Sequence, residues 1–346
     1  MDKSRRVFLQ LLLTSFLLSA CQRAKKLDFG TFKPPTASQL ENRNKHISKV
    51  AVIESHKYDE DEILENLKKY IQYFPNLNLE NKTVILKPNM VDYWPGKVIS
   101  TNAIFLASVI RLCEYLQAKD IIVAEGSGNF RDTEFVLAKT GIGDVCKAKQ
   151  VKFVDLNIDD IEPVANPDGF SGINPFYLPK TILNADVIIS LPKMKCHHWA
   201  LLTASMKNFF GIVPGKKYGW PKNLLHHRGI PRCIIDLILL AKPHFAIVDG
   251  ILAMEGDGPL NGDAVEANLI IMGDDLASVD ATCARVMELE LDKIPYLAMA
   301  GKVIGNIDND HIEILGSPIA KVKKAFKRPI TYINSELLSL GKNQSS

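Results

Sequence analysis

The sequence predicts an α/β fold, with a mostly parallel sheet covered by helices on both faces, as a single unit or as two α/β subdomains. Short apolar runs alternate with longer segments whose apolar residues recur at helical spacing. The apolar runs are nearly continuous, which is typical of parallel strands buried on both faces. Polar and ionisable residues gather directly after these runs, where sheets of this kind bind their ligands.

Residues 1–21 predict an export signal with a lipobox. A basic start containing Arg5 and Arg6 precedes an apolar run over 11–20, shorter than the roughly 20 apolar residues that cross a bilayer. Residues 4–9 resemble a twin-arginine signal, and 18–21 resemble a lipobox in which Cys21 becomes the lipidated first residue. An ordinary secretion signal with two chance arginines is the alternative. We therefore expect a lipoprotein that faces the extracytoplasmic side of a membrane.

The rest of the chain divides into a tether at 22–47, which is polar and lacks periodicity, a body at 48–330 and a C-terminal tail at 331–346. The apolar runs of the body predict strands at 49–55, 83–87, 120–124, 151–156, 186–191, 244–248, 269–272 and 311–315. The helical spacing predicts helices at 59–74, 101–116, 201–210, 230–241, 276–288 and 295–300. Asp275, just before one of these helices, is expected to cap it.

Composition excludes some classes of partner and cofactor. Removing residues 1–21, which hold Asp2, Lys3, Arg5 and Arg6, lowers the formal net charge from +3 to +1. A nearly neutral body argues against nucleic acid as a partner, because proteins that bind nucleic acid carry a basic stripe. Beyond Cys21 the cysteines are dispersed and form no Cys-x-x-Cys pair. A cysteine-ligated iron–sulfur cluster is therefore not expected.

Lysines and amides after the strands predict an anion-binding site. Lysine is rarely buried without a partner, so lysines within apolar sequence point to an anionic ligand, although solvent-facing lysines at a strand end are the alternative. Asp249, near Glu255 and Asp257, would bind a hard cation or pair with these lysines. The predicted ligand-binding residues are Lys87, Asn89, Lys193, Lys195, Lys207, Asn208 and Asp249.

Two histidine pairs predict proton-transfer or metal chemistry. Histidine titrates near neutral pH and is the commonest metal ligand. We expect His197 or His198 to be catalytic, and His226 or His227 to be a metal ligand. Adjacent side chains point in different directions, so at most one of each pair would be used. Packing or surface histidines are the alternative.

Several long segments carry a family resemblance. Residues 87–89, 191–197, 205–211 and 249–259 resemble the uncharacterised family numbered 362 among the domains of unknown function, over about residues 48–310. Some members of that family carry ferredoxin-type cluster modules, whose cysteines this chain lacks. The resemblance implies an α/β body, and the family brings no assigned reaction.

A remoter resemblance is to the nickel-dependent lactate racemase family. The matching positions are His197, Lys207, Pro214-Gly215 and His226 or His227. In that family the lysine holds a nicotinic-acid-derived pincer cofactor, and histidines serve as metal ligand and base. This chain departs from the pattern at 204–206, where a Gly-Gly turn is replaced, and in the position of the last histidine.

Together these patterns predict an exported, membrane-tethered protein that binds an anionic small molecule in a cleft lined by lysine and histidine. We expect this protein to be an enzyme or cofactor protein, racemase- or isomerase-like by resemblance, that uses a divalent metal or an anionic organic cofactor. The alternatives are a non-catalytic ligand-binding lipoprotein and an accessory protein for cofactor maturation or electron transfer.

Overall fold

The computed structural model describes residues 46–128, 131–220 and 222–333. The predicted export signal with Cys21, nearly all of the predicted tether and residues 334–346 lie outside the described residues. Within the described residues, no helix is both long enough and apolar enough to span a membrane.

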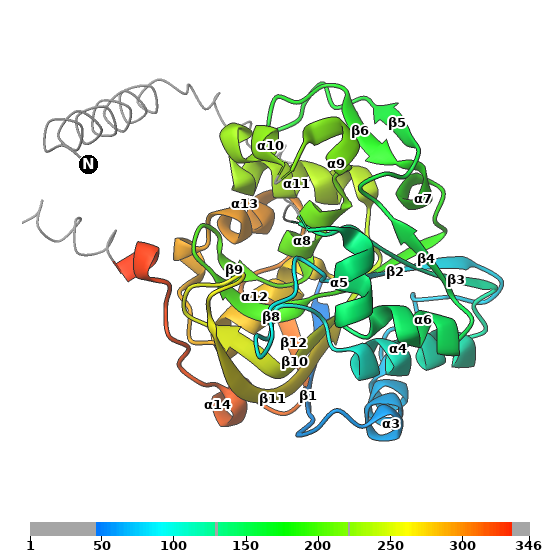
Figure 1. The fold of residues 1–346 in the computed structure, drawn as a ribbon. Coiled ribbons are helices and arrows are strands. Elements are labelled where there is room, and N and C mark those ends of the chain that lie inside the picture. The colour runs from blue at the N-terminus through cyan, green and yellow to red at the C-terminus, as the bar shows by residue number, and fades with distance from the viewer. Residues whose placement is uncertain (1–45, 129–130, 221, 334–346) are drawn as a thin grey trace, which may run out of the picture. The chain divides into compact units, whose positions relative to one another are not determined.

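Ten strands of the described chain form one mixed, mostly parallel sheet, which confirms the predicted fold class (Figure 1). Its order is β12-β1-β11-β10-β7-β2-β3-β4, and β8 pairs with both β10 and β9. The strands are β1 (Ser48–Glu54), β2 (Thr83–Pro88), β3 (Asp120–Glu125), β4 (Lys152–Asp155), β7 (Val187–Leu191), β8 (Lys193–His197), β9 (Leu201–Thr203), β10 (Phe245–Glu255), β11 (Asp263–Gly273) and β12 (Ile312–Gly316). A separate antiparallel pair is formed by β5 (Ile161–Val164) and β6 (Phe176–Pro179).

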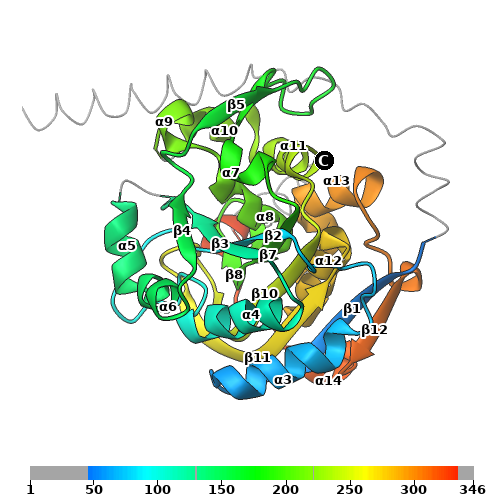
Figure 2. The ribbon, with the colours of Figure 1, turned by 90° about the vertical axis from the view of Figure 1, so that its right-hand side faces the viewer.

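Helices cover both faces of the sheet (Figure 2). Val50 and Val52 of β1 pack into one hydrophobic cluster, whereas Ala51 and Ile53 pack into the other, as the period of two in a strand requires. The cluster of Ala51 includes side chains of α3 (Glu60–Ile71), α4 (Ala103–Tyr115), α5 (Thr133–Lys139) and α6 (Ile142–Ala148). The cluster of Val50 includes side chains of α8 (Ser205–Asn208), α11 (Ile230–Ala241), α12 (Leu276–Val286) and α13 (Pro295–Val303). The remaining helices are α7 (Lys180–Leu183), α9 (Gly215–Tyr218), α10 (Asn223–Arg228) and α14 (Ile319–Val322), with 3-10 turns at Phe209–Ile212, Leu291–Lys293 and Asn309–His311.

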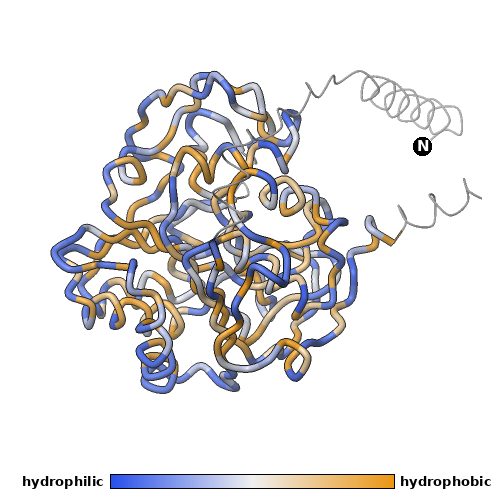
Figure 3. The backbone as a smooth tube through the Cα atoms, turned by 180° about the vertical axis from the view of Figure 1, so that it is seen from behind, coloured by the Kyte–Doolittle hydropathy of each residue, from blue (hydrophilic) through white to orange (hydrophobic). Residues whose placement is uncertain are grey.

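Local sequence explains where these elements begin. The backbone is hydrophobic through the central strands and more hydrophilic at many connecting loops (Figure 3). Asp59 and Asn102 cap α3 and α4 by accepting hydrogen bonds from backbone N–H groups of the first turn. Asp275 does the same for α12, accepting from Ala277 and Ser278, which confirms the predicted cap.

Two segments that follow predicted strands are themselves strands. Residues 193–197 form β8 because they pair with β9 on one side and, at isolated positions, with β10 on the other. β10 continues past Val248 to Glu255, because its apolar residues pair antiparallel with β11 beyond an irregularity at Gly250. The predicted helix at 201–210 is replaced by β9, α8 and a 3-10 turn. The side chains expected on loops after the strands are thus held by the hydrogen bonds of a sheet.

Candidate functional site

A cavity of about 440 Å³ lies at the edge of the sheet where β2, β3 and β7 end. Its walls come from the residues after β2 and β3, from β8, β9 and α8, and from α10. This is the edge at which open α/β sheets bind ligands. The predicted site residues that line it are Asn89, Lys195, His197, His198, Lys207, Asn208, His226 and His227.

A buried carboxylate fixes the short helix that carries Lys207. Asp280 of α12 accepts hydrogen bonds from the backbone N–H groups of Ser205 (2.7 Å) and Met206 (3.2 Å). It also accepts from the Ser205 hydroxyl (2.5 Å) and from the Tyr296 hydroxyl (3.0 Å). These contacts satisfy N–H groups that a four-residue helix leaves unpaired, so α8 presents Lys207 from a fixed position.

An ion pair lies at the cavity wall, with Glu125 in the lining and Lys87 behind it. Lys87 Nζ is 2.8 Å from Glu125 Oε2 and also donates to Asn208 Oδ1 (3.2 Å), and both charged side chains are almost completely buried. Asn208 Nδ2 in turn donates to the Lys87 carbonyl and to Ser190 Oγ. A Cβ at Gly211 would lie 2.6 Å from Glu125 Oε2 and 2.7 Å from Lys87 Nζ. Only glycine therefore lets the backbone approach this pair so closely.

Three further lysines line the cavity, and none of them has a carboxylate partner among the described residues. Lys195 Nζ donates to the Ile99 carbonyl (2.8 Å), and Lys222 Nζ donates to the Gly211 carbonyl (3.2 Å). Lys207 Nζ lies 4.6 Å from the centre of the Phe210 ring. Glu125, the carboxylate that lines this cavity, is already paired with Lys87.

The unpaired lysines perturb one another. Burial, followed by Lys207 and Lys193, holds the pKa of Lys195 well below its usual range. Burial and the charges of Lys222 and Lys87 lower the pKa of Lys207 to about 7. Burial also lowers the pKa of Lys222 to about 8. Burial in the cavity wall therefore disfavours positive charge on groups that are ordinarily protonated.

Hydrogen bonds determine the tautomers of two histidines. His197 Nδ1 accepts from the backbone N–H groups of Trp199 (3.0 Å) and Ala200 (3.2 Å), so the proton of its neutral ring resides on Nε2. His226 Nδ1 lies 3.1 Å from the Lys222 carbonyl and donates to it, which leaves its Nε2 as a lone-pair acceptor. Burial is the largest cause that lowers the pKa of both histidines. Both rings are therefore neutral near pH 7.

Aromatic rings connect the histidines at one end of the cavity. The rings of His197 and His198 stack with centroids 4.9 Å apart, and His198 Nδ1 lies 2.6 Å from the Gly258 carbonyl. Trp199 packs edge-on against His198 at 4.5 Å and against His226 at 5.2 Å. Trp199 is 61% exposed, so this indole borders solvent as well as the cavity.

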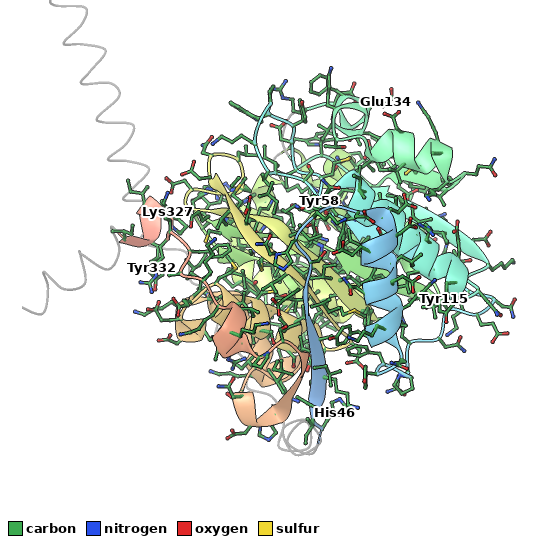
Figure 4. The ribbon with its side chains drawn as sticks, turned by 90° about the horizontal axis from the view of Figure 1, so that it is seen from below. His46, Tyr58, Tyr115, Glu134, Lys327 and Tyr332 are labelled. Atoms are coloured by element: carbon green, nitrogen blue, oxygen red, sulfur yellow. The ribbon has the colours of Figure 1, made fainter. Side chains whose placement is uncertain are left out.

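Lys193 and Asp249 do not line this cavity. Lys193 Nζ is 2.5 Å from Asp249 Oδ2 and also donates to the Tyr58 hydroxyl and to the Leu252 carbonyl. Tyr58, between β1 and α3, lies beside the β10–β11 hairpin (Figure 4). Asp249 therefore pairs with a lysine, which is one of the two roles that the sequence left open for it. A ligand-binding role for Lys193 or Asp249 stays a prediction. Lys87 lies behind the wall, as described above.

The geometry of the described residues adds no support for a metal site or for a reactive thiol. Within residues 46–333, apart from the gaps at 129–130 and 221, no three His, Cys, Asp or Glu side chains gather as metal ligands would. His226 and His227 line the cavity, and a metal role for either stays a prediction. Burial raises the pKa of the Cys196 thiol to about 12, which keeps that group protonated and unreactive.

Sequence reasoning did not select Glu125, Lys222, Thr203, Trp199 or Phe210 as site residues, yet all of them line the cavity. Glu125 is the last residue of β3 and directly precedes a Gly-Ser-Gly turn. Because ligands bind beyond the carboxyl ends of parallel strands, this position could have been selected from the sequence. Lys222 lies in an irregular segment and has a left-handed backbone (φ 67°). No local pattern identifies it.

Fold and cavity together define an α/β protein whose candidate site, at the carboxyl edge of its sheet, is lined by lysine and histidine. The chain belongs to the family described as Domain of unknown function (DUF362), whose model matches residues 84–285. This confirms the family that the sequence motifs indicated. Every residue lining the cavity, from Asn89 to Leu260, falls within that match.

The chain is similar to proteins from several organisms. A thylakoid-associated protein from Synechocystis sp. is 28% identical over 259 residues, which is 73% of this chain and 78% of that protein. Among solved structures, the lactate racemase apoprotein from Thermoanaerobacterium thermosaccharolyticum has 15% identity and a TM-score of 0.43, over 75% of this chain. A protein from Thermotoga maritima has 13% identity and a TM-score of 0.39, over 68% of this chain. The chain covers 60% and 61% of those two structures, respectively.

Proposed function

We propose that the body of this protein binds a small organic anion in the cavity. The observation that carries the proposal is the cluster of Lys195, Lys207 and Lys222, which has no carboxylate partner among the described residues. A buried charge without a counter-charge is strongly unfavourable. A bound carboxylate or phosphate would supply the missing charge and would explain why three such lysines converge.

The charges around the cavity favour an anion over a cation. Lys87 and Glu125 neutralise each other, and the neighbouring histidines His197 and His226 are neutral near pH 7. What remains is the positive charge that the three unpaired lysines acquire when an anion approaches. A volume of about 440 Å³ suits a small metabolite.

Two buried oxygen atoms give further support. Asn89 Oδ1 and Thr203 Oγ1 have no hydrogen-bond partner among the described residues, and both residues line the cavity. Buried polar atoms are nearly always paired in folded proteins. Unpaired oxygens beside a lysine cluster are consistent with a wall that a polar ligand or its bound water completes.

Binding of sulfate, acetate and malonate at pH 6.5 tests the proposal, by isothermal titration calorimetry and by tryptophan fluorescence, because Trp199 lines the cavity. Lys207→Ala is expected to weaken binding about tenfold, the value of one charge-assisted hydrogen bond, and Lys207→Arg to weaken it less. Lys119→Ala is the matched control, because Lys119 is exposed and lies before β3, at the opposite edge of the sheet. Absence of binding for all three anions, or equal weakening by Lys119→Ala and Lys207→Ala, would contradict the proposal.

A second function, proton transfer on the bound anion, is favoured by the His226 tautomer. Its Nε2 is an unprotonated acceptor in the cavity wall, and Lys207 lies against the same Phe210 ring. A general base needs this state near neutral pH. Exchange of carbon-bound hydrogen of malonate for deuterium in D₂O, followed by NMR, should be faster with the protein and slower with His226→Gln. Equal exchange rates with and without protein would argue for binding alone.

We also propose that the protein is exported by a twin-arginine signal and anchored through a lipid on Cys21. The support is the sequence of residues 1–21 alone. Replacing Arg5 and Arg6 together by lysine should leave the protein inside the cell, as measured by fractionation. Cys21→Ala should release it from membranes, because each buried CH₂ of a lipid chain contributes about 0.8 kcal/mol. Unchanged export, or unchanged membrane association, would reject the respective half of the proposal.

A further inference from the structure

Lys207 differs from the other lysines around the cavity. Lys87 is paired with Glu125, and Lys195 and Lys222 donate to backbone carbonyls. Among the described residues the Lys207 amine has no hydrogen-bond or ion-pair partner, and it lies 4.6 Å from the centre of the Phe210 ring. Its side chain also keeps some exposure, whereas those of Lys195 and Lys222 are almost completely buried. Its nitrogen is therefore the one in this lysine cluster that has no protein hydrogen-bond or ion-pair partner among the described residues.

The surroundings of Lys207 favour a free amine. Lys222 and Lys87 place positive charge nearby, and most of the Lys207 side chain is buried. These causes lower the pKa of Lys207 to about 7. About half of its amine is then unprotonated at neutral pH, against roughly one part in a thousand for an ordinary lysine. Desolvation and a neighbouring cation are the means by which proteins make a lysine nucleophilic.

We propose that Lys207 forms an imine with a small anionic aldehyde or ketone that occupies the cavity. The inference rests on the proposed anion binding, because Lys195 and Lys222 would hold the carboxylate or phosphate of that molecule. The arrangement supplies both requirements of such chemistry: a cationic cluster that fixes the anionic end and one unencumbered amine that reaches the carbonyl carbon. The ligand class is thus narrowed from organic anions to those that carry an aldehyde or ketone, such as 2-oxo acids.

The reaction balances without any further reagent. The nitrogen lone pair of Lys207 forms the N–C bond while the carbonyl π electrons move to oxygen, which gives a carbinolamine once a proton passes from nitrogen to oxygen. The C–O bond then breaks, and the second nitrogen proton leaves with that oxygen as water, so one water is released for each imine formed. His226 Nε2 is the acceptor that we assign to relay these protons: the His226 ring and the Lys207 nitrogen both pack on the Phe210 ring, at 5.3 Å and 4.6 Å from its centre.

Reductive trapping tests the inference. Full-length protein at pH 7 is incubated with glyoxylate and sodium cyanoborohydride, and carboxymethylated lysines are located by peptide mass spectrometry. Lys207 is expected to be modified at least tenfold faster than Lys119, which is exposed. Sulfate should protect Lys207 and leave Lys119 unaffected. Modification of Lys207 at the rate of Lys119, or without protection by sulfate, would overturn the inference.

The variant Lys207→Arg separates this inference from the proposed function. A guanidinium keeps the positive charge and forms no imine under these conditions, so cavity labelling should disappear while sulfate binding weakens less than in Lys207→Ala. If sulfate binds and Lys207 is not trapped, the imine is rejected and anion binding stands. If sulfate, acetate and malonate all fail to bind, the proposed function falls, and the inference falls with it.

Discussion

Raising the pH from 6 to 9 is expected to weaken sulfate binding by about 100-fold through Lys207 alone. Burial and the charges of Lys222 and Lys87 lower the pKa of Lys207 to about 7, so about 90% of its amine is charged at pH 6 and about 1% at pH 9. A bound anion favours the ammonium form and raises the pKa of Lys207. Above pH 7, sulfate binding therefore requires the Lys207 amine to take up a proton, so Kd rises about tenfold for each pH unit. Sulfate itself does not titrate in this range, so the effect belongs to the protein.

Calorimetry measures this linkage directly. At constant ionic strength, Kd is determined at intervals from pH 6 to pH 9, and at pH 8 the heat is compared in buffers of different ionisation enthalpy. Roughly 0.9 proton per sulfate should be taken up at Lys207 at pH 8, in addition to a smaller contribution from Lys222, whose pKa is lowered to about 8. Lys207→Arg should lose the part that belongs to Lys207 and retain the parts that belong to Lys222, about tenfold over the range, and to Lys195, whose pKa is also lowered by burial. A Kd that stays constant with pH, or a pH dependence that is the same in Lys207→Arg, would refute the reasoning.

Three further predictions concern stability. Lys195→Met should raise the free energy of unfolding at pH 7 by about 1–3 kcal/mol, because burial disfavours the charged form of this lysine in the folded protein. The gain should be smaller near pH 10, where the lysine of the unfolded chain also loses its charge. If urea denaturation shows a lower free energy of unfolding instead, Lys195 stabilises the core. Gly211→Ala should destabilise it by about 2 kcal/mol or more, because the new Cβ would push apart Glu125 and Lys87; an unchanged melting temperature would contradict this. Asp280→Asn should cost about 2 kcal/mol at pH 8 and about 1 kcal/mol more at pH 5, because burial raises the pKa of Asp280 to about 6, so the wild-type protein gains stability when this group takes up a proton; a loss that is the same at pH 5 and pH 8 would contradict this.

The convergence of the site could be predicted from chain order. Residues that follow parallel strands meet at one edge, and this brings together Asn89, Lys195 and Lys207, although more than a hundred residues separate the first from the others. The sequence also held a signal for β8. In 193–197, lysine and histidine alternate with Met194 and Cys196, and both apolar residues belong to the core cluster.

Other parts of the site depend on tertiary contacts that a local pattern does not encode. Lys193 and Lys195 share a face of β8 by their spacing, yet the irregular pairing with β10 gives Lys193 a carboxylate partner and leaves Lys195 none. Lys222 reaches the cavity through a left-handed backbone conformation and a bond to the Gly211 carbonyl. Such placements follow from the packing of distant segments, so composition and periodicity could not reveal them.

The residues that match the family model and the residues that form the complete sheet have different boundaries. Residues 84–285 contain every residue that lines the cavity, but β1 and β12 lie outside that range and complete one side of the sheet in the order β12-β1-β11. β1 pairs with β11 from Leu269 to Gly273, where the strand is buried. A fragment cut at 84 and 285 would therefore leave a long apolar edge of unpaired N–H and C=O groups, which invites pairing with other chains. A soluble binding domain of this protein must begin before Ser48 and extend past Gly316.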